Sequence, residues 1–188
     1  MRLKSPRIWP LQESEWNHAQ KAELQPFAER NQLFNIYTTI GHNPDALRSF
    51  LAWGSYVLRR SSLPAREREL IICRAGYFCC SGYEWAQHSR LGKREGLSDI
   101  ELENIKYGPD GEKWNTRDNV LLTATEELLT DHFITDETWR NMSQLLSQTE
   151  CMDLVFIVGH YTQVCMILNT FGVQLDEGLL PDKDLEKF

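Results

Sequence analysis

Helix start signals recur along the whole chain, and no segment alternates apolar and polar residues as a half-buried strand does. At residues 43–44, an asparagine suited to the N-cap precedes a proline suited to the first helical position. Comparable signals occur at Pro64, Ser81-Gly-Tyr-Glu84, Ser98-Asp-Ile-Glu101 and Thr135. The sequence therefore predicts an all-α fold without a β-sheet.

The same signals, together with apolar spacing, predict where the helices lie. We expect helices at 13–25, 32–41, from Pro44 past Leu58, from Pro64 to about Phe78, from Ser81 to just before Gly96, after Ser98, and at about 117–130, 136–147 and 150–171. The segment from Lys106 to Thr116 is predicted to be a loop. The last helix is apolar nearly all round, so it should be buried centrally or at a subunit interface, and Gly172 should end it.

Composition narrows the class of protein. A chain of 188 residues is long enough for one domain with a sizeable core. Its net charge of −7 argues against a nucleic-acid partner. We expect no membrane span, because we find no run of about 18 apolar residues, and no signal peptide. The expected location is therefore the cytoplasm. The five cysteines are an odd number without zinc-site spacing, which favours free thiols.

Three ionisable residues that can exchange protons lie in or next to a long apolar run: Glu69, Glu84 and His88. Glu84 and His88 are four residues apart, so a helix places them on one face. A carboxylate beside an imidazole raises its pKa and fixes its tautomer, as a general acid or base requires. Glu69 can join them if the two helices fold back antiparallel about a turn at 79–82. This cluster is the candidate catalytic site.

Each of these residues also has a purely structural interpretation. In Ser81-x-x-Glu84, the glutamate occupies the position that closes a capping box. Glu69 lies in a charged first turn, where acidic residues complement the helix dipole. His88 precedes basic residues typical of a helix surface. His160, in the apolar last helix, suits a buried structural histidine, and with His88 and Glu84 it is also an alternative metal-ligand set.

Five blocks of sequence resemble the carboxymuconolactone decarboxylase-like family, which belongs to the alkylhydroperoxidase D-like superfamily. They are residues 43–54, 63–70, 83–88, 96–101 and 153–173. The main signal covers 63–103 of a single domain spanning 1–188, with a helical extension at 1–42 and a disordered acidic tail from about 176 to 188. The resemblance implies a helical bundle that assembles into trimers or hexamers.

The family includes decarboxylases of a lactone and peroxidases with a Cys-x-x-Cys pair. In the peroxidase pattern, eleven residues separate a glutamate from the first cysteine of that pair, and three residues separate the second cysteine from a histidine. Glu69 and His88 match this pattern, whereas Ser81 and Glu84 occupy the two cysteine positions. A dithiol peroxidase needs both thiols. The pairing of Glu84 with His88 is therefore more similar to the decarboxylase branch.

We accordingly expect an enzyme without a cofactor or metal that performs acid–base chemistry on a small organic acid or lactone, as a decarboxylase or a related lyase or isomerase. His88 is the expected general acid/base, tuned by Glu84 or Glu69. Ser81, Tyr83 and His160 are the expected substrate-binding residues.

Two alternatives remain open at this stage. The first is a thiol peroxidase that uses relocated cysteines at Cys79 or Cys80, or a cysteine of a partner subunit. The second is a catalytically silent binding or assembly module. In every case the expected partners are a small molecule and further copies of the chain, rather than nucleic acid or membrane.

Overall fold

The computed structural model describes residues 2–112 and 114–185, in which every regular element is a helix. The α-helices are α1 (His18–Ala28), α2 (Asn35–Ile40), α3 (Pro44–Arg59), α4 (Ala65–Phe78), α5 (Gly82–Arg94), α6 (Asp99–Ile105), α7 (Thr116–Thr130), α8 (Asp136–Leu145) and α9 (Gln148–Phe171). Short 3₁₀ helices lie at Glu13–Glu15 and Gly108–Asp110. The prediction of an all-α fold is confirmed.

Several helix boundaries follow the predicted caps. The Asn43 side chain accepts a hydrogen bond from the Ala46 N–H at 3.1 Å, and α3 begins at Pro44. Thr135 caps α8, and Gly172 ends α9 in the left-handed region with φ +70°. The predicted start of the first helix at residue 13 was wrong. Asn17 caps α1, and only a 3₁₀ turn precedes it. The predicted loop at 106–116 contains the second 3₁₀ helix.

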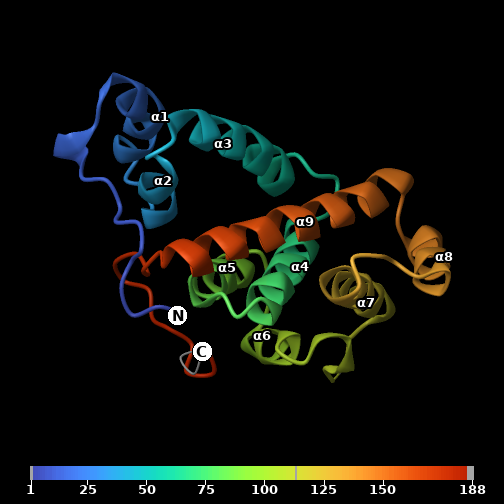
Figure 1. Cartoon of the computed structure of the whole chain (residues 1–188). Helices are drawn as coiled ribbons and strands as arrows, with labels where there is room; N and C mark the ends of the chain where they lie inside the picture. The colour runs from blue at the N-terminus through green and yellow to red at the C-terminus, as the bar shows by residue number, and fades with distance from the viewer. Residues whose placement is uncertain (1, 113, 186–188) are drawn as a thin grey trace.

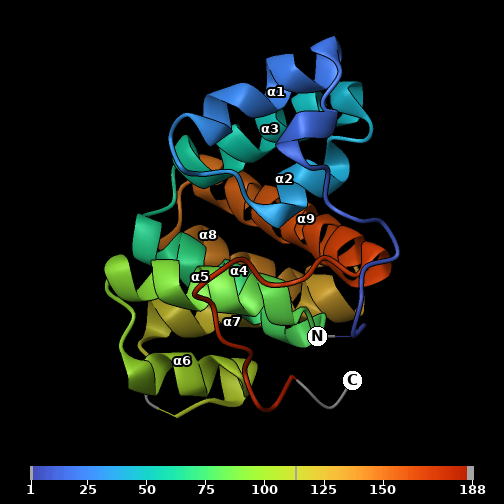
Figure 2. The same cartoon turned by 90° about the vertical axis from the view of Figure 1, so that its left-hand side faces the viewer.

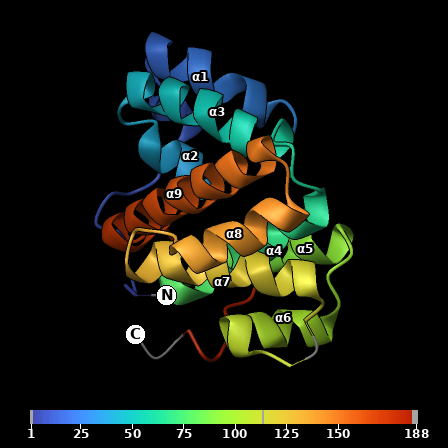
Figure 3. The same ribbon diagram turned by 90° about the vertical axis from the view of Figure 1, so that its right-hand side faces the viewer.

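The helices form layers around α9, which crosses the middle of the molecule (Figure 1). Helices α1, α2 and α3 lie on one side of α9, and α4, α5 and α7 lie on the other (Figures 2 and 3). Helix α6 lies beyond α4 and α5. The core consists of apolar side chains from all these layers, including Leu47, Leu70, Ile71, Leu121 and Ile157.

Helix α9 is long and apolar enough to cross a membrane by length and composition, with a mean hydropathy of 1.6 over its best window. Polar residues such as His160, Thr162 and Gln163 interrupt its apolar side chains, so α9 contains no unbroken run of about 18 apolar residues. Helix α9 also packs against α3, α4, α5, α7 and α8, and 56% of that window is buried within the molecule. The core helix of a globular protein has the same properties.

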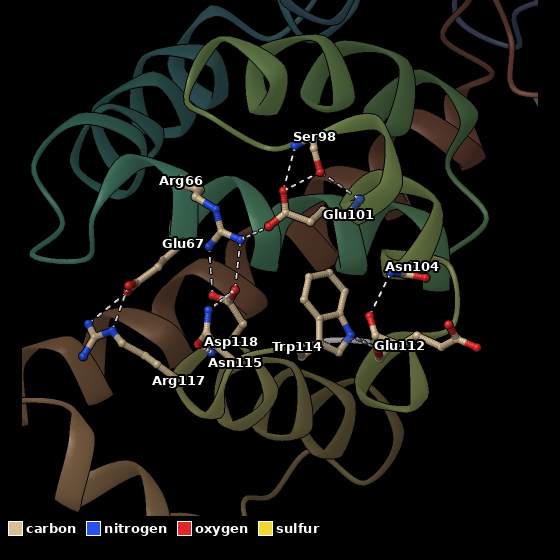
Figure 4. Close-up of polar contacts among 11 residues, drawn as sticks. Arg66, Glu67, Ser98, Glu101, Asn104, Glu112, Trp114, Asn115, Arg117 and Asp118 are labelled. Carbon is tan, nitrogen blue, oxygen red and sulfur yellow. Dashed lines mark hydrogen bonds and ion pairs between the residues drawn. The ribbon is translucent and has the colours of Figure 1, made fainter.

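Two arginines connect the first turns of α4 and α7 to each other, and one of them also reaches α6 (Figure 4). Arg66 donates two hydrogen bonds of 2.9 Å to the carboxylate of Asp118 and also pairs with Glu101. Arg117 pairs with Glu67 at 2.8 Å. Asp118 is only 2% exposed, so these partners stabilise its negative charge in place of water.

Replacing Asp118 by alanine should therefore destabilise the fold. The change leaves Arg66 without its bidentate partner, but Arg66 is partly exposed and can regain water. We expect a loss of about 2 kcal/mol in the free energy of unfolding, measured by urea denaturation at an unchanged m-value. The matched control is Asp110→Ala, at an exposed aspartate that makes no ion pair with another described residue, which should change stability by less than about 0.5 kcal/mol. Equal effects of the two variants would contradict this interpretation.

Part of the segment predicted as a disordered tail lies against the helices. Asp176 accepts hydrogen bonds from the Asn35 backbone N–H and the Gln87 side chain, both at 2.7 Å. Asp182 accepts a hydrogen bond of 3.1 Å from the Trp85 indole N–H. The segment therefore connects α2 and α5 near the cavity described below. Residues 186–188 lie outside the described residues.

Candidate functional site

The turn between α4 and α5 brings Glu69 and His88 together. The two helices pack side by side, and Glu69 Oε2 lies 2.7 Å from His88 Nδ1. Both side chains are buried. A carboxylate at Nδ1 orients the ring and places the other nitrogen, Nε2, toward a reacting group. The predicted antiparallel arrangement and the contact it allows are both present.

Glu84 faces the other side of the same imidazole. Its Oε1 lies 3.1 Å from His88 Nε2, but the alignment is not that of a hydrogen bond, and Oε1 has no hydrogen-bond partner among the described residues. The capping-box interpretation of Glu84 was wrong, because neither its side chain nor that of Ser81 caps α5. A buried carboxyl oxygen without a partner can accept a proton or donate one to a ligand.

A glycine on the neighbouring helix allows Glu84 to adopt this position. Gly76 lies in α4, where a Cβ atom would approach Glu84 Cγ to 3.2 Å. The absence of a side chain at Gly76 thus lets α5 approach α4 closely. The sequence indicated Gly76 only as a residue within a helix.

Burial and mutual charge shift the titration of this cluster. Burial, reinforced by the charge of Glu69 and opposed by His88, raises the pKa of Glu84 from 4.5 to about 7. Burial lowers the pKa of His88, but the two carboxylates outweigh it, so that the His88 pKa is raised overall. Such a coupled pair holds a proton that titrates near neutral pH, as general acid–base catalysis requires.

The cluster opens into a cavity of about 410 Å³. Glu84, His88 and Tyr161 line its inner part, and aromatic side chains from α1, α2 and α3 form the opposite wall: Phe27, Tyr37 and Phe50. This size and lining suit a small organic molecule. The N-terminal helices, predicted only as an extension, therefore provide half of the cavity.

Four exposed arginines border the same cavity, and the sequence did not reveal them as a group. They are Arg30, Arg59, Arg90 and Arg94. Within the described part of the chain, Glu84 is the only acidic residue that lines this cavity. The arginines come from three separate parts of the sequence, so only the fold brings them together. In a chain of net charge −7, this local positive charge favours an anionic ligand.

The structure places the predicted substrate-binding residues differently. Tyr83 lines the cavity, but its hydroxyl donates a hydrogen bond to Asp176 and is therefore not free for a substrate oxygen. Ser81 is fully buried and is not among the cavity-lining residues. Its hydroxyl has no hydrogen-bond partner among the described residues. The predicted direct contact of these two hydroxyls with substrate is therefore not supported.

His160 does line the cavity, and its Nδ1 has no hydrogen-bond partner among the described residues. Burial and the nearby charge of His88 lower the pKa of His160 to about 4, so the ring is neutral at pH 7. The Tyr161 ring contacts the His160 and His88 rings edge-on, with centroid distances of 5.2 and 5.0 Å. In residues 2–112 and 114–185, no three His, Cys, Asp or Glu side chains are arranged to hold a metal ion.

The two predicted redox cysteines differ in their surroundings. Cys79 is the C-cap of α4, and its carbonyl accepts a hydrogen bond of 2.9 Å from Asn169 of α9. Cys80 adopts a left-handed conformation with φ +51°, and its thiol points back to the Phe78 carbonyl at 3.7 Å. Neither cysteine is among the residues that line the cavity.

Comparison with family models gives one match over the segment that contains this cluster. Residues 44–105 match the carboxymuconolactone decarboxylase family. The match covers about one third of the chain. The family segment contains Glu69, Glu84 and His88, but it excludes α1, α2 and α9, which complete the cavity.

Comparisons over the whole chain give structural likeness without close sequence identity. No curated protein matches the sequence. The AhpD core of an uncharacterized peroxidase-related protein from Ralstonia eutropha JMP134 is similar, with a TM-score of 0.77, 14% identity, and coverage of 97% of this chain and 96% of that one. A variant of the debrominase Bmp8 in complex with 2,3,4-tribromopyrrole is similar with a TM-score of 0.75, 14% identity and coverage of 93% and 94%. At these identities the likeness establishes an AhpD-like helical fold for this chain.

Proposed function

We propose that this chain is an acid–base enzyme that acts on a small organic acid, as a decarboxylase or a related lyase or isomerase. The observation that carries the proposal is the buried Glu69–His88–Glu84 cluster at the inner end of the cavity. The cluster provides a proton at neutral pH, the aromatic wall accommodates a carbon skeleton, and the arginines attract a carboxylate.

In a decarboxylation, the C–C bond to the substrate carboxylate breaks and carbon dioxide leaves. The electron pair of that bond moves into an adjacent carbonyl group and forms an enolate. The proton held between His88 and Glu84 then adds to the enolate carbon, and solvent restores it. Glu69 holds His88 through Nδ1 during this cycle. The neutral His160 can accept a hydrogen bond from the substrate at its free Nδ1 or donate one from it, depending on the tautomer.

Two observations make this assignment preferable to a thiol peroxidase of the usual family pattern. Ser81 and Glu84 occupy the positions of the cysteine pair, and a carboxylate cannot replace a resolving thiol. Cys79 and Cys80 are not part of the cavity lining. The proposed chemistry therefore depends on the carboxylates and the histidine and does not require a thiol.

The proposal is tested with a panel of β-keto acids and carboxylated γ-lactones. We expect carbon dioxide release from at least one of them, with Cys79→Ser and Cys80→Ser variants as active as the wild type. If the panel is inert and hydroperoxide is consumed in a thiol-dependent manner, the proposal is wrong. If neither chemistry occurs and no compound changes the thermal stability, a silent binding or assembly module is indicated.

The arginines at the cavity rim should affect KM for an acidic substrate more than they affect kcat. Replacing Arg59 or Arg94 by methionine should raise KM for an acidic substrate about 3- to 10-fold and leave kcat within about twofold. The reason is that each exposed guanidinium attracts the substrate anion without touching the reacting carbon. The matched control is Arg60→Met, next to Arg59 but directed over the Tyr56 ring. Equal KM values for Arg59→Met, Arg94→Met and Arg60→Met would contradict the role of the rim.

We further propose that the chain acts in the cytoplasm as a homo-oligomer, with a small molecule and neither nucleic acid nor membrane as its other partner. A stripe of exposed apolar residues on α9, formed by Met152, Val155 and Met166 around the open Gly159, supports association between copies. The acidic net charge supports the exclusion of nucleic acid.

A further inference from the structure

The decarboxylation proposed above creates a negative charge at an oxygen atom. When carbon dioxide leaves, that charge moves onto the carbonyl oxygen of the enolate, while His88 and Glu84 are needed at the enolate carbon. A hydrogen-bond donor aimed at such an oxygen is often the largest single contribution to catalysis. Neither hydroxyl expected for this task is suitable, because Ser81 is outside the cavity lining and Tyr83 donates to Asp176.

Tyr161 has the free hydroxyl that this task requires. It lies in α9, lines the cavity, and packs edge-on against the His88 ring with centroids 5.0 Å apart. Among the described residues, none accepts a hydrogen bond from the Tyr161 hydroxyl. Although the residue is only 5% exposed, this hydroxyl is not enclosed by protein atoms as that of Ser81 is. It is therefore a free donor in the same cavity as the proton source.

The surroundings of Tyr161 keep its phenol protonated. Burial raises the pKa of Tyr161 well above its ordinary value, and the charges of Glu84 and Glu69 add to this effect, although Arg68 opposes it. A protonated phenol donates a hydrogen bond without losing its proton at neutral pH. Tyr161 can thus stabilise charge at an oxygen atom while the Glu69–His88–Glu84 cluster supplies the proton for carbon.

A second tyrosine lines the opposite wall of the cavity but is less suited to this role. Tyr37 lies in α2, where its ring packs against Phe27 and Phe34 with centroid distances of 4.8 and 5.7 Å. Among the described residues, Tyr161 contacts the His88 ring and Tyr37 does not. The carbon and the oxygen of an enolate are only two bonds apart, so the proton source and the oxygen donor must be neighbours. This requirement favours Tyr161.

We propose that Tyr161 is a catalytic residue that donates a hydrogen bond to the enolate oxygen, and that the substrate is a β-keto acid. This inference rests on the function proposed above. As the C–C bond breaks and carbon dioxide leaves, the bonding pair forms the C=C bond of the enolate, and the carbonyl oxygen takes the negative charge. Tyr161 keeps its proton, and the proton held between His88 and Glu84 adds to the enolate carbon.

Binding of a stable oxyanion tests this site without turnover. The probe is 3,4-dinitrophenolate at pH 6.5, where the compound is ionised and Glu84 still holds its proton, and calorimetry measures Kd. Tyr161→Phe should raise that Kd about 10- to 100-fold, because a hydrogen bond to a charged oxygen is lost. The Kd of neutral 1,2-dinitrobenzene, which lacks this oxygen, should change less than about twofold. Tyr77→Phe, at a partly buried tyrosine outside the cavity lining, is the matched control and should bind the phenolate like the wild type.

Three results of this titration would overturn the assignment. They are a wild type that does not bind the phenolate, equal Kd values for the wild type and Tyr161→Phe, and a larger loss of affinity in Tyr37→Phe than in Tyr161→Phe.

Turnover separates this inference from the proposed function. With a β-keto acid from the panel, Tyr161→Phe should lower kcat by a factor of about 10² to 10³ and leave KM within about threefold. If Tyr161→Phe keeps the wild-type kcat while His88→Gln loses it, the role of Tyr161 is wrong and the acid–base function stands. An inert panel refutes the decarboxylation itself. Turnover of the lactones alone would contradict the β-keto acid assignment.

Discussion

Replacing His88 by glutamine is expected to lower kcat by a factor of about 10² to 10⁴, the usual contribution of a positioned general acid or base. Glutamine retains a polar side chain of similar length, but it cannot carry the proton that the Glu69–His88–Glu84 cluster provides. The measurement is the rate of carbon dioxide release at saturating substrate, using the acid identified in the panel described above.

Two controls separate loss of chemistry from loss of fold. His18→Gln changes an exposed histidine in the first turn of α1 and should keep full activity. Thermal unfolding of His88→Gln should remain cooperative, because the His88 ring lines the cavity and the apolar core is left unchanged. A folded His88→Gln variant with wild-type kcat would disprove the proposed mechanism.

Replacing Glu84 by glutamine should change how stability depends on pH. Between pH 4.5 and about 7, the folded wild type holds a proton on Glu84 that the unfolded chain has released. A carboxyl group with a raised pKa therefore stabilises the fold fully below pH 4.5, and that stability is lost as the pH rises through about 7. Between pH 4.5 and about 7, the free energy of unfolding of the wild type should therefore fall on the order of 3 kcal/mol relative to that of Glu84→Gln, at about 1.4 kcal/mol per pH unit.

Urea denaturation at pH 4.5 and pH 8 measures this difference. The gain of Glu84→Gln over the wild type should be larger at pH 8, whereas activity should fall because the second proton-carrying group is missing. Glu137→Gln, at an exposed glutamate in the first turn of α8, serves as the control and should follow the wild type at both pH values. Parallel pH curves for Glu84→Gln and the wild type would show that Glu84 titrates normally.

Local signals were sufficient to predict most of the fold. A cap such as Asn43-Pro44 depends on hydrogen bonds within one helical turn, so the residues that make it are adjacent in the sequence. The first helix was misplaced because Asn17 and Gln20 form a capping box that competes with the polar residues before it. The membrane criterion for α9 depends on average hydropathy, whereas its actual environment depends on the helices that surround it.

The candidate site was predictable only in part. The spacing of Glu84 and His88 on one helix, and of Glu69 before a turn, follows from helix geometry. The same spacing wrongly favoured a capping box at Ser81, because sequence does not show that Gly76 leaves room for Glu84. The arginine rim joins distant segments, so it depends on tertiary packing alone.

The most direct test of the central claim is an NMR titration of ¹⁵N-labelled histidine rings in the substrate-free protein, with His88→Gln used to assign the His88 signal. We expect His88 to titrate above 6.5 and to keep its proton on Nδ1, where Glu69 accepts it. We also expect the Glu84→Gln variant to lower the His88 pKa. A His88 ring that titrates at or below 6.5, unaffected by Glu84→Gln, would contradict the account.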